Sequence, residues 1–391
     1  MRQLPFEYAY RNIGRSRSRL VATVGGAALV VLLVLASAGF VRGMSLTLVP
    51  AARLQENVIL LGAGSEEAIE RSQIDANVAT IAAASVPNVK EADGVPLVSP
   101  EVHMALIVRT ERDSAVEREA VMRGVRPVAL LVHPQVELVE GRFPRPGRDE
   151  LMVGSLTATQ LGVAEERLAV GRTLWFDDRA WTISGRFSAP TSVMNAEVWL
   201  PLTDLQVATR RESTISCVIL TLSEEGRVRD ADIFAKTRLD LEIAAVGEEA
   251  YYAGIAAFYG PIRAMIVVTA ALIALGAVLG GLNTIYAGFA ARVREIGMLQ
   301  ALGYRRSAVV LSLLEESLFT AAIGAVVGVG VGLVVLDGVA VRFSMGAFAL
   351  TLDGPVVLTG LLGGLAVGLV GAIPPAVRCL RMPITQALKS F

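Results

Sequence analysis

Four long runs of uncharged, apolar residues constrain the fold of this chain more than any other feature. They extend over residues 20–41, 264–291, 317–336 and 354–377. A helix that crosses a bilayer needs roughly 20 consecutive apolar residues, and a helix in a soluble core rarely stays uncharged for so long. The sequence therefore predicts four transmembrane helices. The first run is too long for the apolar part of a cleaved signal peptide, so we interpret it as an uncleaved anchor.

Charged residues are concentrated in one block between the first two runs. Hydrophobic residues make up 53% of the chain and charged residues only 19%, and 54 of the 73 charged side chains lie within residues 42–263. Such a composition is typical of a membrane protein that carries one large soluble-like domain. We expect this domain between the first and second helices.

The distribution of arginine in the short flanks predicts the orientation of the helices. Basic residues cluster in the N-terminal tail, in the connection between the second and third runs and in the C-terminal tail. The connection between the third and fourth runs has only Arg342, beside Asp337 and Asp353. Both termini and the second-to-third connection are therefore predicted to be cytoplasmic, and the charged block to lie outside.

The predicted fold is thus a membrane protein with four transmembrane α-helices and a large α+β extracytoplasmic domain inserted between helices 1 and 2. The chain is predicted to begin with a cytoplasmic N-terminal amphipathic segment and to end with a cytoplasmic tail. The predicted segments are the N-terminal segment 1–19, helix 20–42, external domain 43–263, helix 264–291, cytoplasmic loop 292–306, helix 307–336, external loop 337–353, helix 354–377 and tail 378–391.

Glycines recur four residues apart in three of the runs, as in Gly276 and Gly280. The other two ridges are triple repeats, Gly324, Gly328 and Gly332, and Gly360, Gly364 and Gly368. Such ridges let helix backbones approach closely in lipid. The pattern predicts helix packing but does not identify the partner helices.

The external block reads as alternating strands and helices. Strands are predicted at 57–61, 102–109, 120–125 and 216–222, and a hairpin over 173–187 with its turn at Asp177–Asp178. Helices are predicted over 67–85, with Ile74, Val78 and Ile81 on one face, and over 227–241. We interpret 136–205 as a mainly β insertion, and the parts 44–125 and 214–255 as one βα subdomain.

No catalytic motif is recognisable in the sequence. None of the three lysines follows a glycine, which excludes the Gly-Lys-Ser/Thr core of a nucleotide-binding P-loop. Neither a Gly-x-Ser-x-Gly elbow nor a His-Glu-x-x-His motif is present. Two cysteines, Cys217 and Cys379, are too few for a disulfide scaffold, and the distant histidines His103 and His133 are expected to serve surface or packing roles. We therefore predict no catalytic, cofactor or metal residues, and no enzyme activity for this chain.

The cytoplasmic loop contains a short amphipathic helix. Ile296, Leu299 and Leu302 can share one face, Arg292, Arg294 and Glu295 surround it, and Gly303 is suited to ending it. Such a helix can rest on lipid or dock into a soluble partner, and its pattern alone leaves both alternatives open.

Several segments resemble one known family, the FtsX-type and MacB-type permeases of ABC transporters. The segment REIGMLQALG at 294–303, followed by LLEES at 313–317, resembles the FtsX-type signature, with Glu316 at the position of a family glutamate early in the third span. AYRNIGRSRSRL at 9–20 is similar to the family's cytoplasmic lead into its first helix. The external segments that resemble the MacB periplasmic core domain are EGRFPRPGRDELMVGSLTATQLG, VGRTLWFDDRAWTISGRF and EVWLPLTDL.

This resemblance implies a permease in a bacterial inner membrane that pairs with a second permease copy, as a homodimer or alternatively as a heterodimer, and acts with an ATPase by mechanotransmission. The ATPase, which would bind ATP and Mg, is expected to be a separate chain because only about nineteen residues precede the first helix. The external domain would divide into a porter part and a β-rich sabre part. The implied coupling helix that contacts the ATPase comprises Arg292, Arg294, Glu295, Ile296, Gly297, Leu299, Ala301, Leu302 and Gly303.

Two functions from different classes fit the resemblance. The first is export or extraction of a hydrophobic substance, peptide, lipid or lipoprotein, with a periplasmic adaptor protein. The second is a scaffold that controls cell-wall hydrolases, as in FtsX. The external block of about 220 residues favours export, because the FtsX external domain is much smaller. A membrane enzyme such as an intramembrane protease is disfavoured by the lack of a catalytic constellation.

Overall fold

The computed structural model describes residues 17–48, 56–112, 116–223, 226–290, 293–343 and 346–381. The chain folds into two compact units. The membrane unit comprises residues 1–42, 261–339 and 350–391, and the external unit comprises residues 43–260 and 340–349. The predicted N-terminal segment up to residue 16 and the tail from residue 382 lie outside the described residues.

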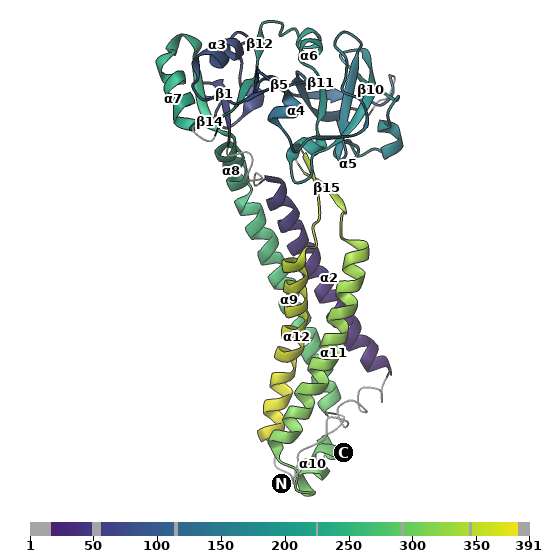
Figure 1. The fold of residues 1–391 in the computed structure, drawn as a ribbon. Coiled ribbons are helices and arrows are strands. Elements are labelled where there is room, and N and C mark those ends of the chain that lie inside the picture. Colours follow the sequence, from purple (N-terminus) through teal and green to yellow (C-terminus); the bar gives the residue numbers. More distant parts are fainter. Residues whose placement is uncertain are drawn as a thin grey trace. The chain divides into compact units, whose positions relative to one another are not determined.

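The membrane unit is built from helices, which Figure 1 shows as long ribbons with one short helix, α10, at one end. Four of the described helices are long and apolar enough to cross a membrane. The helices are α2 (Arg17–Leu48), α9 (Gly260–Ala290), the short α10 (Val293–Ala301), α11 (Arg306–Val335) and α12 (Gly354–Arg381).

The two triple glycine ridges pack against neighbouring helices. A Cβ added to Gly324 or Gly328 on α11 would lie 2.7 Å from a backbone oxygen of α2, that of Val24 or Ala28. On α12, a Cβ at Gly360 would meet Leu35 of α2 at 2.7 Å, and one at Gly368 would meet Ala321 of α11 at 2.3 Å. The ridges therefore hold α2, α11 and α12 at backbone contact.

Helix α9 differs from these three. No residue of its most apolar 18-residue window is buried, whereas about a third of the corresponding window of α12 is buried. A Cβ added to Gly276 would meet nothing within 4 Å. The apolar sides of α9 are therefore not covered by the described part of the chain.

The external unit is organised around one continuous sheet. Nine of its ten strands follow the order β14-β1-β13-β5-β6-β11-β8-β10-β7, and the tenth, β9, pairs with β10. These strands are β1 (Asn57–Gly62), β5 (Val98–Val108), β6 (Arg118–Val125), β7 (Glu137–Gly141), β8 (Glu150–Gly154), β9 (Thr173–Phe176), β10 (Arg179–Ser188), β11 (Val198–Pro201), β13 (Cys217–Thr221) and β14 (Ile243–Gly247).

Shorter elements cover the sheet. The short strands are β2 (Ile74–Asp75), β3 (Glu91–Ala92), β4 (Val95–Pro96) and β12 (Thr214–Ile215). The helices are η2 (Ile69–Arg71), α3 (Val78–Ser85), α4 (Ala129–Val132), α5 (Thr157–Leu161), η3 (Glu165–Leu168), η4 (Val193–Ala196), α6 (Leu202–Ala208), α7 (Val228–Thr237), η5 (Leu239–Leu241) and α8 (Glu248–Phe258).

Strand β5 joins the two halves that the sequence distinguishes. Its first residues pair with β13, where Glu101 lies opposite Cys217, and its later residues pair with β6, where His103 lies opposite Arg123. The β insertion continues from there through β11, which runs parallel to β6. The halves therefore share one sheet and are not separate layers.

The structure has the predicted hairpin, but two of the predicted helices are shorter. Strands β9 and β10 pair across Asp177 and Asp178, which both have positive φ as a tight turn requires. In the range 67–85, predicted as one helix, η2 and β2 precede α3, the single α-helix of this range. The helix starts late because Ile74 pairs with Ile215 in β12 and the Asp75 carboxylate accepts the Asn77 N–H. The helix predicted over 227–241 breaks at Arg238, where φ is −105°.

The loop predicted over 337–353 contains a hairpin, β15 (Ala340–Phe343) and β16 (Gly346–Ala349), that belongs to the external unit. Ala347 and Phe348 are buried there, and a Cβ at Gly43 would lie 2.2 Å from the Ala349 oxygen. The external unit is therefore assembled from the insertion after α2 and from the connection between α11 and α12.

Candidate functional site

The connection between α9 and α11 forms helix α10, whose inner side packs against the start of α11. Ile296 is buried and contacts Val309, with Val293, Val310 and Leu313 around them. Gly297 and Gln300 are also buried, and Leu299 and Glu295 are half-buried. The helix is thus held by a small hydrophobic cluster of the chain itself. Arg292 lies outside the described residues.

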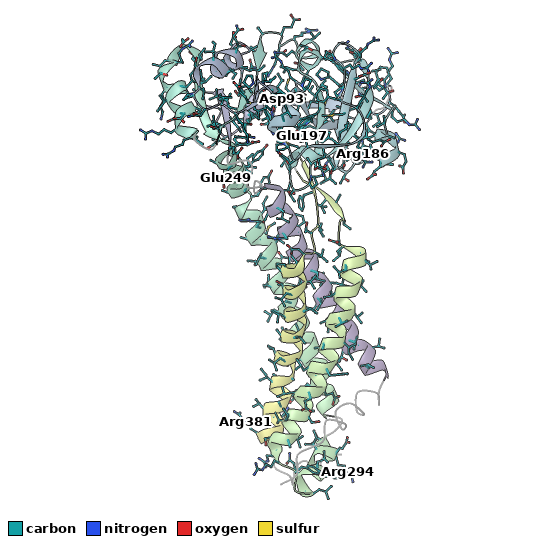
Figure 2. All side chains as sticks on the ribbon, in the orientation of Figure 1. Asp93, Arg186, Glu197, Glu249, Arg294 and Arg381 are labelled. Atoms are coloured by element: carbon teal, nitrogen blue, oxygen red, sulfur yellow. The ribbon has the colours of Figure 1, made fainter. Side chains whose placement is uncertain are left out.

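The outer side of α10 is apolar and exposed. Met298 and Leu302 are 49% and 73% exposed, and they are spaced one helical turn apart. Ala301 and Arg294 are exposed beside them, and Figure 2 labels Arg294 at this helix. The spacing predicted that Leu302 shares the buried face of Ile296. It does not, because α10 ends at Ala301 and Leu302 lies beyond the helix. Gly303 follows with φ +91°, a conformation suited to glycine.

Glu316 lies half-buried on α11. Its neighbour Ser317 is buried and donates a hydrogen bond from Oγ to the Gly368 oxygen at 2.7 Å. The position of the family glutamate therefore lies beside the contact that joins α11 to α12.

The sheet of the external unit carries a row of polar side chains that crosses four strands. Cys217 on β13 lies opposite Glu101, His103 lies opposite Arg123, and Arg123 lies opposite Trp199 on β11. Residues two apart on a strand share a face, so Glu101 and His103 point the same way. All five residues are buried.

Glu101 is the centre of this row. Its carboxylate accepts hydrogen bonds from Ser99 Oγ and the Arg123 guanidinium, each at 2.8 Å. The Nε2 atoms of His103 and His133 lie 2.9 Å from the same carboxylate. Burial opposes ionisation, but attraction from His133 and Arg123 and the hydrogen bonds outweigh it and hold the pKa of Glu101 well below its usual range. The carboxylate is therefore ionised and fully paired.

Arg123 joins Glu101 to a second buried carboxylate. Its Nε and Nη2 donate to Glu197 at 2.7 and 2.8 Å, and the indole N–H of Trp199 donates to Glu197 at 2.8 Å. Burial disfavours the charge of Glu197, but Arg123 outweighs it and lowers the pKa of that carboxyl. A guanidinium in this bidentate geometry is well suited to a buried ion pair.

Glu248, the first residue of α8, is the third buried acid. It accepts the Asn57 amide at 2.7 Å, and its Oε1 lies 4.0 Å from His133 Nδ1. Glu248 Oε1 and His133 Nδ1 both lack a hydrogen-bond partner among the described residues. Burial raises the pKa of Glu248. The cluster thus connects the sheet to the helix that precedes α9.

A metal ion is disfavoured at this cluster. Glu101, His103 and Cys217 each offer a ligand atom, and these atoms lie within 4.8 Å of one another. The Glu101 carboxylate is already occupied by four donors, one of them the Arg123 cation. Burial raises the pKa of the Cys217 thiol well above its usual range, and a metal ligand must be deprotonated. We therefore assign no metal to these residues.

The two histidines converge although 30 positions separate them in sequence, which the sequence alone did not predict. The one signal in the sequence was that polar residues at 99, 101 and 103 alternate with Pro100 and Val102. Such alternation normally indicates a solvent face. Here, Tyr251, Tyr252 and Val132 pack on that face of the sheet and bury it.

Comparison with known proteins matches two family models. The MacB-like periplasmic core domain matches residues 20–248, and the FtsX-like permease C-terminal model matches residues 267–384. The chain is 34% identical over 111 residues to the macrolide export ATP-binding/permease protein MacB of Nitrobacter winogradskyi, covering 28% of this chain and 17% of that protein. It is 28% identical over 110 residues to an uncharacterized ABC transporter permease, YvrN, of Bacillus subtilis, covering 28% of this chain and 26% of the relative.

A solved structure, the periplasmic region of MacB from Actinobacillus actinomycetemcomitans, matches 49% of this chain and 88% of its own length, with 10% identity and a TM-score of 0.38. The sequence matches thus span well under a third of each curated relative, whereas the periplasmic core model alone spans more than half of this chain. With the FtsX-like model on most of the remainder and four helices able to cross a membrane, this multi-pass membrane protein belongs to the ABC transporter permeases of the MacB/FtsX type.

Proposed function

We propose that this permease couples ATP hydrolysis on a separate ABC ATPase to movements of its external unit. The complex exports or extracts a hydrophobic substance, peptide, lipid or lipoprotein. In this proposal the chain itself hydrolyses no ATP, and ATP and Mg bind to the partner. The protein lies in the bacterial inner membrane, with its external unit in the periplasm and both termini in the cytoplasm.

The exposed pair Met298 and Leu302 is the observation that supports coupling through α10. Ile296 attaches the helix to α11, so a force applied to the outer side of α10 reaches that span directly. Two apolar side chains are few for strong anchoring in lipid but enough to fill a groove in a protein. Arg294 and Glu295 add polar specificity at the edge, with less effect on affinity.

The uncovered surface of α9 supports pairing with a second copy of the chain. Its apolar window has no buried residue, and Gly276 leaves room for close backbone approach. A homodimer through α9 and a periplasmic adaptor on the external unit complete the proposed assembly.

The coupling helix is tested with Leu302→Asp in the permease co-expressed with an ABC ATPase encoded beside it. Burying a leucine contributes about 2–3 kcal/mol, so the variant should weaken ATPase docking by up to ~100-fold. Co-purification and transport-linked ATP turnover are the readouts. Leu302 is a sharper choice than the half-buried Leu299, because its exposure spares the contact with α11.

The matched control is Leu239→Asp, at a leucine that is 79% exposed in the external unit. It should leave both readouts unchanged. If Leu302→Asp inserts normally and retains wild-type co-purification and turnover, α10 merely lies on the membrane.

The orientation is tested by labelling single cysteines in a Cys217→Ser, Cys379→Ser background. A cysteine at Asp177 should react with a membrane-impermeant maleimide from outside, and one at Ser390 only after the membrane is opened. Equal labelling of both from outside would contradict the proposed topology.

A further inference from the structure

The external unit contains a cavity between the buried polar row and α8. Its volume is about 110 Å³. The floor is formed by His103, Arg123 and Glu197, and the wall by Tyr252 and Ile255 of α8. Glu197, labelled in Figure 2, thus both pairs with Arg123 and lines the cavity. The cavity is smaller than the roughly 150 Å³ that hold a benzene ring, so it fits a small head group with the first carbons attached to it.

The lining is richer in carboxylates than in cations. Glu70 and Glu197 face the cavity against one guanidinium, Arg123. All three nitrogens of that guanidinium already donate to Glu197 or to Glu101 behind the floor. Among the described residues, Glu197 Oε1 accepts one hydrogen bond, from Arg123 Nη2, and a carboxylate oxygen can accept two. The cavity therefore favours a hydrogen-bond donor with positive charge and disfavours an anion.

The wall and rim of the cavity are apolar or aromatic and adjoin membrane segments along the chain. Tyr259, in the lining, immediately precedes α9, and Gly346 belongs to the connection between α11 and α12. Tyrosines are enriched where proteins meet the membrane interface, because their rings are apolar and their hydroxyls polar. A cavity lined partly by residues that lead into membrane helices therefore suits a ligand that is soluble in that interface.

We propose that this cavity binds the head of a membrane-soluble amphiphile that carries a protonated amine. The amine lies toward Glu197 and Glu70, and the first carbons of the apolar chain lie against Tyr252 and Ile255. The proposal rests on the proposed export function only in identifying the ligand as transported cargo. Binding itself requires neither ATP nor a partner protein, so failure of binding and failure of export are measured separately.

The test uses the full chain in phosphatidylcholine nanodiscs without ATPase. Three photoreactive probes share one eight-carbon chain with a diazirine at the same carbon, and end in an amine, a hydroxyl or a carboxylate. The amine probe should label the α8 peptide about tenfold more than the carboxylate probe, as expected for ~1.4 kcal/mol of discrimination. Excess octylamine should compete with it. Equal labelling by the carboxylate probe, or amine labelling confined to other segments, would overturn the proposal.

Two variants separate shape from charge. Ile255→Phe fills the cavity and should abolish α8 labelling by the amine and hydroxyl probes, whereas Ile233→Phe, on the exposed side of α7, should not. Glu70→Gln keeps the volume and should reduce the preference for the amine over the hydroxyl probe severalfold. Its control is Glu249→Gln, at an exposed acid of α8 outside the lining. If the two glutamate variants behave alike, charge recognition by the cavity is refuted.

Discussion

The two units of this permease bury opposite kinds of residues. In the membrane unit, glycines such as Gly328 bring α11 to backbone contact with α2. In the external unit, the interior of the sheet holds the fully buried charges of Glu101 and Arg123. Lipid is as apolar as any side chain, so close packing holds helices together there, whereas a buried charge needs an opposite charge. Each interior therefore depends on a specific partner, but for a different physical reason.

A second contrast, between a packed glycine and an uncovered one, exists within the membrane unit. Gly328 and Gly276 lie in similar apolar helices, yet a Cβ at Gly328 would lie 2.7 Å from the Ala28 oxygen and one at Gly276 would meet nothing within 4 Å. One motif thus has two environments. A glycine ridge is therefore a contact inside the chain only where a second helix packs against it.

Gly328→Leu should have the largest effect, because the new side chain must displace the backbone of α2. Overpacking a well-packed site costs typically 1–3 kcal/mol, and a clash with backbone lies at or above the upper end. We expect a lower yield of monodisperse protein and a Tm several degrees below wild type, measured by size exclusion in detergent and by thermal unfolding.

Gly276→Leu is the matched control for this prediction. It should leave the Tm of the detergent-solubilised monomer unchanged and reduce only the proposed dimer, measured by crosslinking. Equal destabilisation by both substitutions would remove the distinction between the two ridges.

Arg123→Met should have the next largest effect. It removes the only guanidinium between Glu101 and Glu197 among the described residues, and breaking a buried pair costs about 3–5 kcal/mol. Lys236→Met, which removes an exposed pair with Asp232, should cost roughly 0–1 kcal/mol. Tryptophan fluorescence during denaturant unfolding measures both, since Trp199 contacts the network. A similar small loss in both variants would show that the cluster is not an electrostatic core.

The sequence alone was sufficient to predict the elements that follow from a local pattern of residues. The apolar runs predicted the four helices, and Asp177–Asp178 with its flanking strands predicted the hairpin. Length and hydrophobicity are properties of a single segment, so no knowledge of the rest of the chain was required. The exposure of Met298 and Leu302 could not be predicted from local sequence alone. It depends on where α10 ends and on the contact of Ile296 with Val309.

The polar cluster could not be predicted in this way. Glu101, Arg123, His133 and Glu248 come from four elements, and only the pairing of β5 with β6 and the packing of α4 and α8 bring them together. Their individual positions look like solvent-facing residues of strands or loops. Likewise, the glycine ridges predicted close packing, but α2 as partner of α11 emerges only from the three-dimensional arrangement.

The smallest expected effect concerns the pH dependence of stability, where Glu101 and Glu248 act in opposite directions. The pKa of Glu101 is lowered in the folded chain, so its contribution is present above the unfolded value of about 4.3 and is lost as pH falls through the folded value. The pKa of Glu248 is raised. Its contribution is therefore complete below about 4.3 and is lost as pH rises through the folded value.

Glu248→Gln separates these two contributions. The amide keeps the size of the side chain and an oxygen for the Asn57 donor, but it cannot ionise beside Glu101 and His133. Relative to wild type, the variant should gain stability as pH rises above about 4.3, by up to ~1.4 kcal/mol per pH unit until the folded pKa is passed. Glu249→Gln, at the exposed neighbour, should show no such trend. Thermal unfolding of the full chain in nanodiscs between pH 4 and 8 measures the difference. A constant offset between Glu248→Gln and wild type across that range would mean that Glu248 has the same pKa in the folded and unfolded chain, so that its burial beside His133 carries no electrostatic cost.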